Sequence, residues 1–404
     1  MTIKGITRTG GLIATVAATL LAAGAALAQS GDPVTVPVGA VEGGALRGLD
    51  LWSAPGSDTG LSPELWRDAS PALATLALNP LGERPLSPAM RALAIRALET
   101  GARAPAGSGE DEALATLRVR ALLRLGRVEA VESILARTPG VEMSEALTRL
   151  RAEAAMARGD IASACAAGDA LRVDRDAGWQ LKLRAWCQLS RGEAAAQLAY
   201  DLWARREETD AAFSQAFAAA LGGGEADPLA AFGLTAPEPA PTPKVARIDL
   251  SQVPSLISLG AAERDRAERL RLQSAALLAA ALREDLNPDA RATLASFDVP
   301  APRATFARLQ GLDAAADGDR PGEVVLYALS IAHQQPQGLG VAERVAIVRA
   351  LARVGLTEDA VRIAAEGLAD LLPPEPEPEP DPAAEDALMP DATATQDPAA
   401  SIFQ

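Results

Sequence analysis

The sequence is poor in the residues that most often perform chemistry. Among 404 residues there is one histidine, His333, and there are two cysteines. A lone histidine cannot pair with a second one on a metal, and it cannot complete a Ser–His–Asp triad here because the chain has no nucleophile-elbow motif. Walker and dinucleotide-binding glycine loops are also missing. We therefore expect no catalytic residue, no metal and no cofactor, and do not expect an enzyme.

Aromatic residues make up only 3% of the chain, and basic residues never gather in a run. The formal net charge is −15, so the electrostatic footprint of a nucleic-acid-binding protein is missing. Alanine and leucine dominate the hydrophobic residues. Both favour helices, whereas the β-branched and aromatic residues that favour strands are scarce. This composition predicts an all-α fold and no nucleic-acid partner.

The longest apolar run lies at the N-terminus and has the form of a secretory signal. Lys4 and Arg8 precede the run, and small residues stand three and one positions before Gln29. We expect a signal peptide over residues 1–28, cleavage between Ala28 and Gln29, and a mature protein in the periplasm. An uncleaved membrane anchor is the alternative, although the run is short for a span. No later run approaches that length, which predicts no integral membrane span in the mature chain.

The rest of the chain divides by composition into five segments. The last segment contains eight acidic residues and no basic one, and its alternating prolines favour an extended polyproline-II conformation. The expected segments are a disordered lead-in at 29–60, with Leu51 and Trp52 docked on the body; an N-terminal helical-repeat lobe at 61–232; a Pro-rich linker at 233–247; a C-terminal helical lobe at 248–372; and a disordered acidic Pro/Glu tail at 373–404.

Three segments of one pattern follow each other in the first lobe and end on Gly126, Gly159 and Gly192, 33 residues apart. In each, the residues nine and five positions before the glycine lie on one helix face. Those seven and three positions before it lie on the nearly opposite face, and both sets are apolar. A helix with two apolar faces is packed between neighbours. The pattern predicts an α-solenoid of antiparallel helix pairs in two lobes.

The second lobe repeats this helix–glycine–helix pattern less regularly. Gly355 stands in a predicted turn, and Gly322 lies one period before it. A long helix is expected from about Ala261 to Glu284, ahead of a helix that begins at Asn287-Pro288.

The first lobe resembles the tetratricopeptide-type helical repeat family over about residues 112–206. The resemblance rests on the period, on the turn glycines, and on small residues in the following helices, namely Ala130, Ala164 and Ala196. It implies a protein or peptide partner bound in a groove between helices.

The two cysteines are predicted to form a disulfide. Cys165 lies early in the second helix of one repeat and Cys187 late in the first helix of the next, equidistant from Asp176 in the turn between them. An antiparallel hairpin would place them side by side, and an exported protein meets an oxidising environment. Two free core residues are the alternative. Redox catalysis is not expected because no Cys-x-x-Cys motif is present.

Arginines recur at one place in the three repeats, between the two apolar faces. Stacked repeats would align them as a basic ladder, and arginine suits bidentate contact with carboxylates. We hypothesise that the ladder binds an acidic segment of a partner, the acidic tail being one candidate. Solvated arginines paired with nearby carboxylates are the alternative. The residues concerned are Arg118, Arg151 and Arg184, with Arg158 and Arg191 near the same angle.

These features predict a non-enzymatic periplasmic scaffold for protein interaction or assembly. One alternative is a structural protein of the cell envelope that binds peptidoglycan or the outer membrane. The acidic chain without a long basic amphipathic helix argues against a membrane surface. A hydrolase would need a catalytic constellation, which we do not find.

Overall fold

A computed structural model describes residues 51–108, 111–206, 210–234 and 248–371, and all of them fall in one unit of the chain. These residues form helices, turns and loops without a strand, so the predicted all-α class is confirmed. None of the described helices is both long and apolar enough to cross a membrane. The expected signal peptide with its cleavage site at Ala28 and Gln29, most of the lead-in and linker, and the acidic tail lie outside the described residues.

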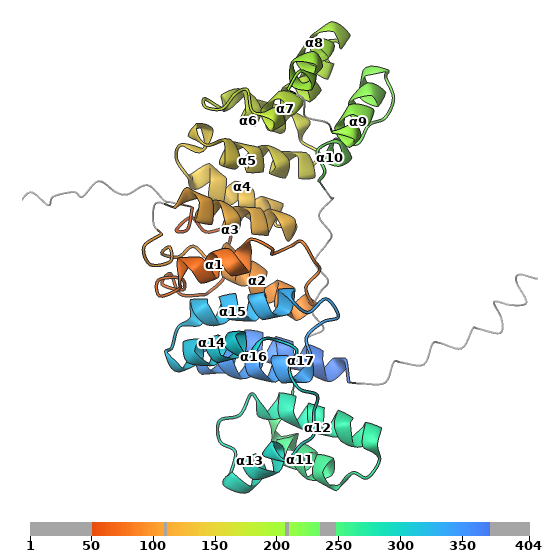
Figure 1. The fold of residues 1–404 in the computed structure, drawn as a ribbon. Helices are drawn as coiled ribbons and strands as arrows, with labels where there is room; N and C mark the ends of the chain where they lie inside the picture. The colour runs from red at the N-terminus through yellow and green to blue at the C-terminus, as the bar shows by residue number, and fades with distance from the viewer. Residues whose placement is uncertain (1–50, 109–110, 207–209, 235–247, 372–404) are drawn as a thin grey trace, which may run out of the picture. The chain divides into compact units, whose positions relative to one another are not determined.

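The helices before the linker follow the predicted pairs closely (Figure 1). Ser87, Asp111 and Ser144 cap the N-termini of three of them by accepting a backbone N–H, which satisfies donors that a helix start leaves open. The elements are α1 (Pro71–Leu78), α2 (Pro88–Glu99), α3 (Glu112–Arg124), α4 (Val128–Arg137), η1 (Val141–Met143), α5 (Glu145–Ala157), α6 (Ile161–Ala170), α7 (Gly178–Gln188), η2 (Leu189–Arg191), α8 (Glu193–Ala204), α9 (Ala211–Leu221) and α10 (Pro228–Ala231).

The helices after the linker differ from expectation at one point. The long helix expected from about Ala261 to Glu284 is shorter and runs from Arg266 to Ala280, because Asp265 caps its start by accepting the backbone N–H of Glu268. Ala261 and Ala262 belong to the helix before it. The elements are η3 (Leu250–Gln252), α11 (Val253–Ala262), α12 (Arg266–Ala280), α13 (Pro288–Ala295), α14 (Phe306–Asp317), α15 (Pro321–His333), α16 (Val341–Arg353) and α17 (Thr357–Ala369).

The repeat glycines end the first helix of each pair in a left-handed conformation. Their φ angles are 74° at Gly126, 77° at Gly159 and 115° at Gly192, a region that costs glycine little. At Gly355 the φ angle is 78°, so the second lobe uses the same turn. The turn before α15 does so without glycine, since Asp319 has φ 51°. Gly322, one period before Gly355, lies inside α15.

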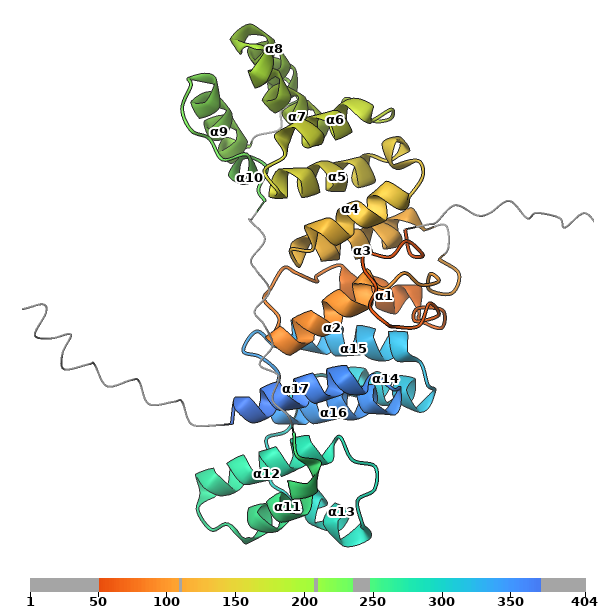
Figure 2. The same ribbon diagram turned by 180° about the vertical axis from the view of Figure 1, so that it is seen from behind.

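Neighbouring helices stack along the chain, and then the chain returns to its beginning. α3 contacts α1, α2, α4 and α5, and contacts continue through α6 and α7 to α8. α1 also packs against α15, and α2 packs against both α15 and α17 (Figures 1 and 2). The first described helices, α1 and α2, therefore lie beside α15 and α17, which come after the linker.

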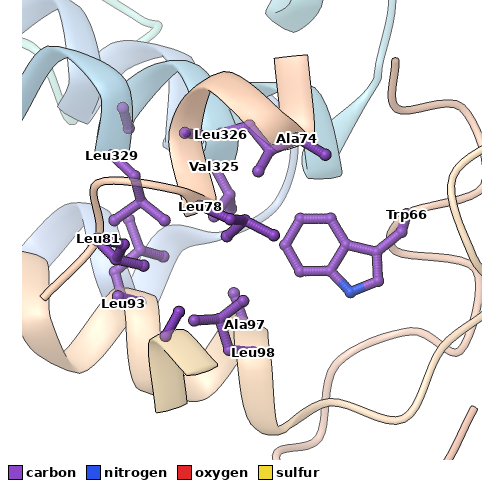
Figure 3. Packing of buried hydrophobic residues seen from close by; sticks show 14 of the residues in the cluster. Trp66, Ala74, Leu78, Leu81, Leu93, Ala97, Leu98, Val325, Leu326 and Leu329 are labelled. Carbon is purple, nitrogen blue, oxygen red and sulfur yellow. The ribbon is translucent and has the colours of Figure 1, made fainter. Parts of the chain in front are cut away.

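One hydrophobic core, which we call the central core, is shared by helices from both sides of the linker. Its buried members come from residues 51–154 and from residues 281–364. Figure 3 shows Trp66 beside Leu78 of α1, with Leu98 of α2 and Leu326 of α15 around them. Leu51 and Trp52 belong to this core as well, with exposed fractions of 6% and 1%, so their expected docking on the body is confirmed.

A second core lies at the far end of the repeats and is rich in aromatic residues. Residues 179–232 contain seven of the chain's 13 aromatic residues. Phe213 is fully buried at the centre, with ring centroids 5.0 Å from Trp203 and 5.6 Å from Phe232. We call this the aromatic core; its ring-bearing members are Trp186, Tyr200, Trp203, Phe213, Phe217 and Phe232.

Candidate functional site

The predicted disulfide between Cys165 and Cys187 is confirmed. The two sulfur atoms lie 1.94 Å apart and the two Cα atoms 5.8 Å apart, joining α6 to α7. Close by, Gly168 has no side chain to hold the helices apart, and its carbonyl accepts a hydrogen bond of 2.7 Å from the Gln180 amide. The disulfide and this buried contact fix the α6–α7 hairpin on which several residues of the candidate site stand.

The predicted arginine ladder is wrong at its first position. Arg118 is fully buried, because residues 51–54 and the end of α2 cover the first repeat. Its guanidinium lies 5.8 Å from the centre of the Trp52 ring. It donates hydrogen bonds to five backbone carbonyls, those of Leu51, Trp52, Ala54, Leu98 and Thr100. Arg118 therefore holds the chain's first described residues in place and offers nothing to a partner.

The other four arginines of the hypothesis do not form one site. Arg158 pairs with Glu132 at 2.7 Å, as the alternative of solvated, paired arginines predicts. Arg184 is half-buried and donates to the Arg175 carbonyl at 3.3 Å. Arg151 and Arg191 are exposed. None of the five lines either of the two clefts described next.

The first cleft, which we call the repeat cleft, lies where α5 and α7 begin and has a volume of about 580 Å³. The α6–α7 turn, the end of α8 and the end of α10 complete it. Its lining is Glu145, Arg149, Asp174, Asp176, Ala177, Gly178, Trp179, Lys182, Arg206 and Phe232.

Two cations of the repeat cleft hold equivalent places in successive repeats. Arg149 on α5 and Lys182 on α7 are 33 residues apart. Arg149 is half-exposed; its Nε bonds Glu153 at 2.7 Å and its guanidinium lies 5.9 Å from the Trp179 ring. Lys182 is more enclosed, pairs with Asp210, and lies 5.6 Å from the Trp203 ring. Hydrogen bonding from Lys182 and from backbone amides lowers the pKa of Asp210, which favours its charged form.

Carboxylates stand around these cations. Asp176 is exposed and pairs with Arg206 at 3.2 Å. Asp174 adopts φ 43°, uncommon for a residue with a side chain, in the turn before α7. Among the described residues, neither Glu145 nor Asp174 has an ion-pair partner. The repeat cleft thus presents charges of both signs over a floor that includes Trp179 and Phe232.

The second cleft, which we call the junction cleft, joins segments far apart in sequence and has a volume of about 470 Å³. Residues of α2, of the first half of α17, of the loop at 57–59 and the residue before α4 line it. Its lining is Ser57, Asp58, Thr59, Pro88, Arg91, Ala92, Ile95, Arg96, Glu99, Arg127, Glu358 and Arg362.

Buried carboxylates hold the arginines of the junction cleft. Glu99 is 4% exposed and accepts a hydrogen bond of 2.6 Å from the Arg127 Nε. Asp359 is 1% exposed and lies between Arg96, at 2.5 Å, and Arg362, at 3.2 Å. Burial raises the pKa of Asp359 more than the two arginines lower it. These pairs orient three of the four guanidinium groups in the cleft; the fourth, of Arg91, donates to the Leu125 carbonyl at 2.8 Å.

Charged side chains of both signs line the two clefts. Within the described residues, no group of three or more His, Cys, Asp or Glu side chains is arranged to hold a metal ion. His333 lies in neither cleft, at the end of α15. Burial, with a smaller contribution from Arg84, lowers its pKa below the ordinary 6.5, so the imidazole is neutral at neutral pH.

The sequence contained a signal for one cleft and none for the other. Arg149 and Lys182 appear in the 33-residue alignment two positions before Arg151 and Arg184, so the same alignment could have identified them. The junction cleft unites residues more than 200 positions apart, which no local pattern shows. No family model, curated protein or solved structure matches this chain.

Proposed function

We propose that this chain is an exported, non-enzymatic scaffold of the tetratricopeptide-like type, which binds a segment of a partner protein in the repeat cleft. The single observation that supports the proposal most is the repetition of a cation, Arg149 and Lys182, along one cleft of successive repeats. Stacked repeats of this kind present extended surfaces on which a partner segment can lie. The disulfide and the absence of a membrane-spanning helix among the described residues are compatible with a secreted location.

The charges of the repeat cleft suit a segment with groups of both signs. Only the Nε of Arg149 has a described partner, which leaves both terminal nitrogens available to a carboxylate. Glu145 and Asp174 can accept hydrogen bonds from backbone amides or a basic side chain. The volume of about 580 Å³ falls within the range of sites that enclose a ligand, here a few side chains of the partner.

The test places a photo-crosslinking residue at Asp174, inside the cleft, and separately at Glu129, an exposed position of α4 outside it. Both proteins are produced in the native host and irradiated in intact envelopes. We expect one protein adduct from position 174 that is missing from position 129. Arg149→Gln should reduce that adduct about tenfold, as loss of a charged hydrogen-bonding group costs roughly 1.5 kcal/mol or more.

Arg151→Gln is the matched control, because it removes an exposed arginine from the same helix two residues away. It should leave the adduct unchanged. Equal losses in the two variants, or identical adducts from positions 174 and 129, would contradict the proposal. Sedimentation of the purified protein with peptidoglycan, lost on Arg149→Gln, would instead favour the envelope-binding alternative.

A further inference from the structure

All three cations that line the repeat cleft already have a carboxylate partner. The terminal nitrogens of Arg149 can still donate hydrogen bonds, but its charge is compensated. Over the described residues, the cleft therefore has no excess of positive charge to offer an anionic ligand. The pairs are Arg149 with Glu153 at 2.7 Å, Lys182 with Asp210, and Arg206 with Asp176 at 3.2 Å.

Two further carboxylates of the cleft, those of Glu145 and Asp174, have no such compensation. Glu145 is half-buried at the first position of α5, and Asp174 is exposed in the turn before α7. Neither side chain has an ion-pair or hydrogen-bond partner among the described residues. Five carboxylates thus accompany three cations, and the whole chain has a net charge of the same sign, −15. The charge balance therefore favours a positively charged group as the ligand of this cleft.

An unused hydrogen-bond donor in the wall of the cleft indicates a peptide and not a bare cation. The Trp179 side chain lines the cleft and is 9% exposed, and among the described residues its indole Nε1 has no hydrogen-bond partner. A buried donor without an acceptor costs free energy, so such groups are seldom left unsatisfied. A main-chain carbonyl of a bound segment is the kind of acceptor that this N–H lacks.

We propose that the repeat cleft binds a basic segment of the partner, with a lysine or arginine side chain held by the carboxylates of Glu145 and Asp174. The inference rests on the proposed function and specifies the chemistry of the partner. The ring of Phe232, which also lines the cleft, packs against the aliphatic stem of that side chain. Arg149 takes a main-chain carbonyl or a single carboxylate next to it. The preferred partner thus has the opposite charge from the one that an arginine ladder would bind.

A photo-crosslinking residue at Ala177 tests the proposal, because Ala177 lines the cleft and its replacement keeps both carboxylates. The full chain with this residue is produced in the native host and irradiated in intact envelopes. The test variant combines Glu145→Gln with Asp174→Asn, and asparagine adopts the left-handed backbone of residue 174 as readily as aspartate does. The control combines Glu129→Gln with Asp169→Asn, which removes the same charge from two exposed carboxylates that line neither cleft.

We expect the protein adduct to fall about tenfold in the test variant, since each partly exposed ion pair contributes up to about fivefold in affinity. In the control variant the adduct should stay within about twofold of its native yield, because the carboxylates of the cleft are intact. Mass spectrometry of the native adduct should find a lysine or arginine of the partner within a few residues of the crosslinked position.

The other outcomes separate this inference from the proposed function. An adduct that is unchanged in the test variant would overturn the inference, and the proposed function would stand if Arg149→Gln still removed that adduct. Equal losses in the test and control variants would show that only the overall charge matters, which would overturn the assignment to Glu145 and Asp174. If the native chain gave no adduct from position 177, the proposed function would fail, and the inference with it.

Discussion

The central core and the aromatic core are built in opposite ways. The central core consists mainly of leucine, alanine and valine, and its residues come from two stretches of chain, 51–154 and 281–364. The aromatic core is rich in aromatic residues, which are scarce in this chain, and draws its buried members from residues 181–231. In the central core, small side chains from many contacting helices fill the interior. In the aromatic core, a few large rings fill it. Aromatic side chains bury much more surface each, so few residues suffice at a stack end.

The comparison teaches that stability in this chain is divided between distant and local contacts. A core whose residues are close in sequence can unfold without the rest of the protein. The units that unfold cooperatively often consist of helices that follow each other in the chain. A core that joins residues 51–154 with residues 281–364 must open as a whole. The following variants test this division, beginning with the largest expected effect.

Arg118→Met should have the largest effect. The substitution keeps much of the volume but removes the donors of five backbone carbonyls at a fully buried site. Each buried acceptor left without a donor costs about 1–3 kcal/mol, so we expect a total loss of about 4–5 kcal/mol after partial relaxation. Thermal and urea unfolding measure the change. A loss below about 1 kcal/mol would show that the central core does not depend on this arginine.

Phe213→Ala should cost about 3–4 kcal/mol, within the range for a buried phenylalanine, and only locally. Hydrogen exchange measured by mass spectrometry should show faster exchange over α8 to α10 with unchanged protection in α2 and α15. The two cores would prove to be one cooperative unit if protection fell equally in both.

Loss of the disulfide should cost about 3 kcal/mol on the chain-entropy model, since it closes a loop with a sequence separation of 22 residues. Replacing Cys165 and Cys187 by alanine together avoids a free thiol. We expect faster proteolysis in the α6–α7 turn and little change in the central core. Identical cleavage rates in the variant and the native chain would show that the disulfide does not stabilise the α6–α7 hairpin.

Gly322→Ala tests the contact between α15 and the 62–69 segment. A Cβ at this position would lie 2.2 Å from the Leu65 carbonyl oxygen, so α15 or the 62–69 segment must move. Overpacking of this kind costs about 1–3 kcal/mol. The melting temperature should fall, with the faster exchange centred on α1 and α15. Gly222→Ala is the control, because a Cβ at that position would meet only atoms at 3.5 Å or more. Gly338→Ala is not suitable, because the φ angle of Gly338 is positive.

The smallest effect concerns pH. Burial lowers the pKa of His333 in the folded protein, so the unfolded chain binds a proton more readily. Stability should therefore fall as pH decreases through the ordinary histidine pKa of 6.5, and this fall should level off below the folded pKa. His333→Gln should remove that part of the pH dependence, measured by urea unfolding between pH 5 and 8. If the free energy of unfolding changed with pH by the same amount in both proteins, titratable groups other than His333 would be responsible.

Local patterns predicted the local features well. The 33-residue period, the turn glycines and the symmetry of Cys165 and Cys187 about Asp176 each depend on residues close in sequence, and each corresponds to a described feature. Arg118 was misplaced because its burial depends on residues 51–54, about 65 positions earlier. Asp319 was missed as a turn residue because the pattern of turn glycines gives no sign of an exposed aspartate with a left-handed backbone.

The return of the chain to its beginning has a consequence for synthesis. The end of α2 at Glu99 and the start of α15 at Pro321 are separated by 222 residues. A ribosome working at 5–20 residues per second needs roughly 10–40 s to make that interval. Throughout it, the faces of α1 and α2 that will meet α15 and α17 remain uncovered. The nascent chain therefore exposes apolar surface for that interval, which makes it prone to aggregation before α15 and α17 are made.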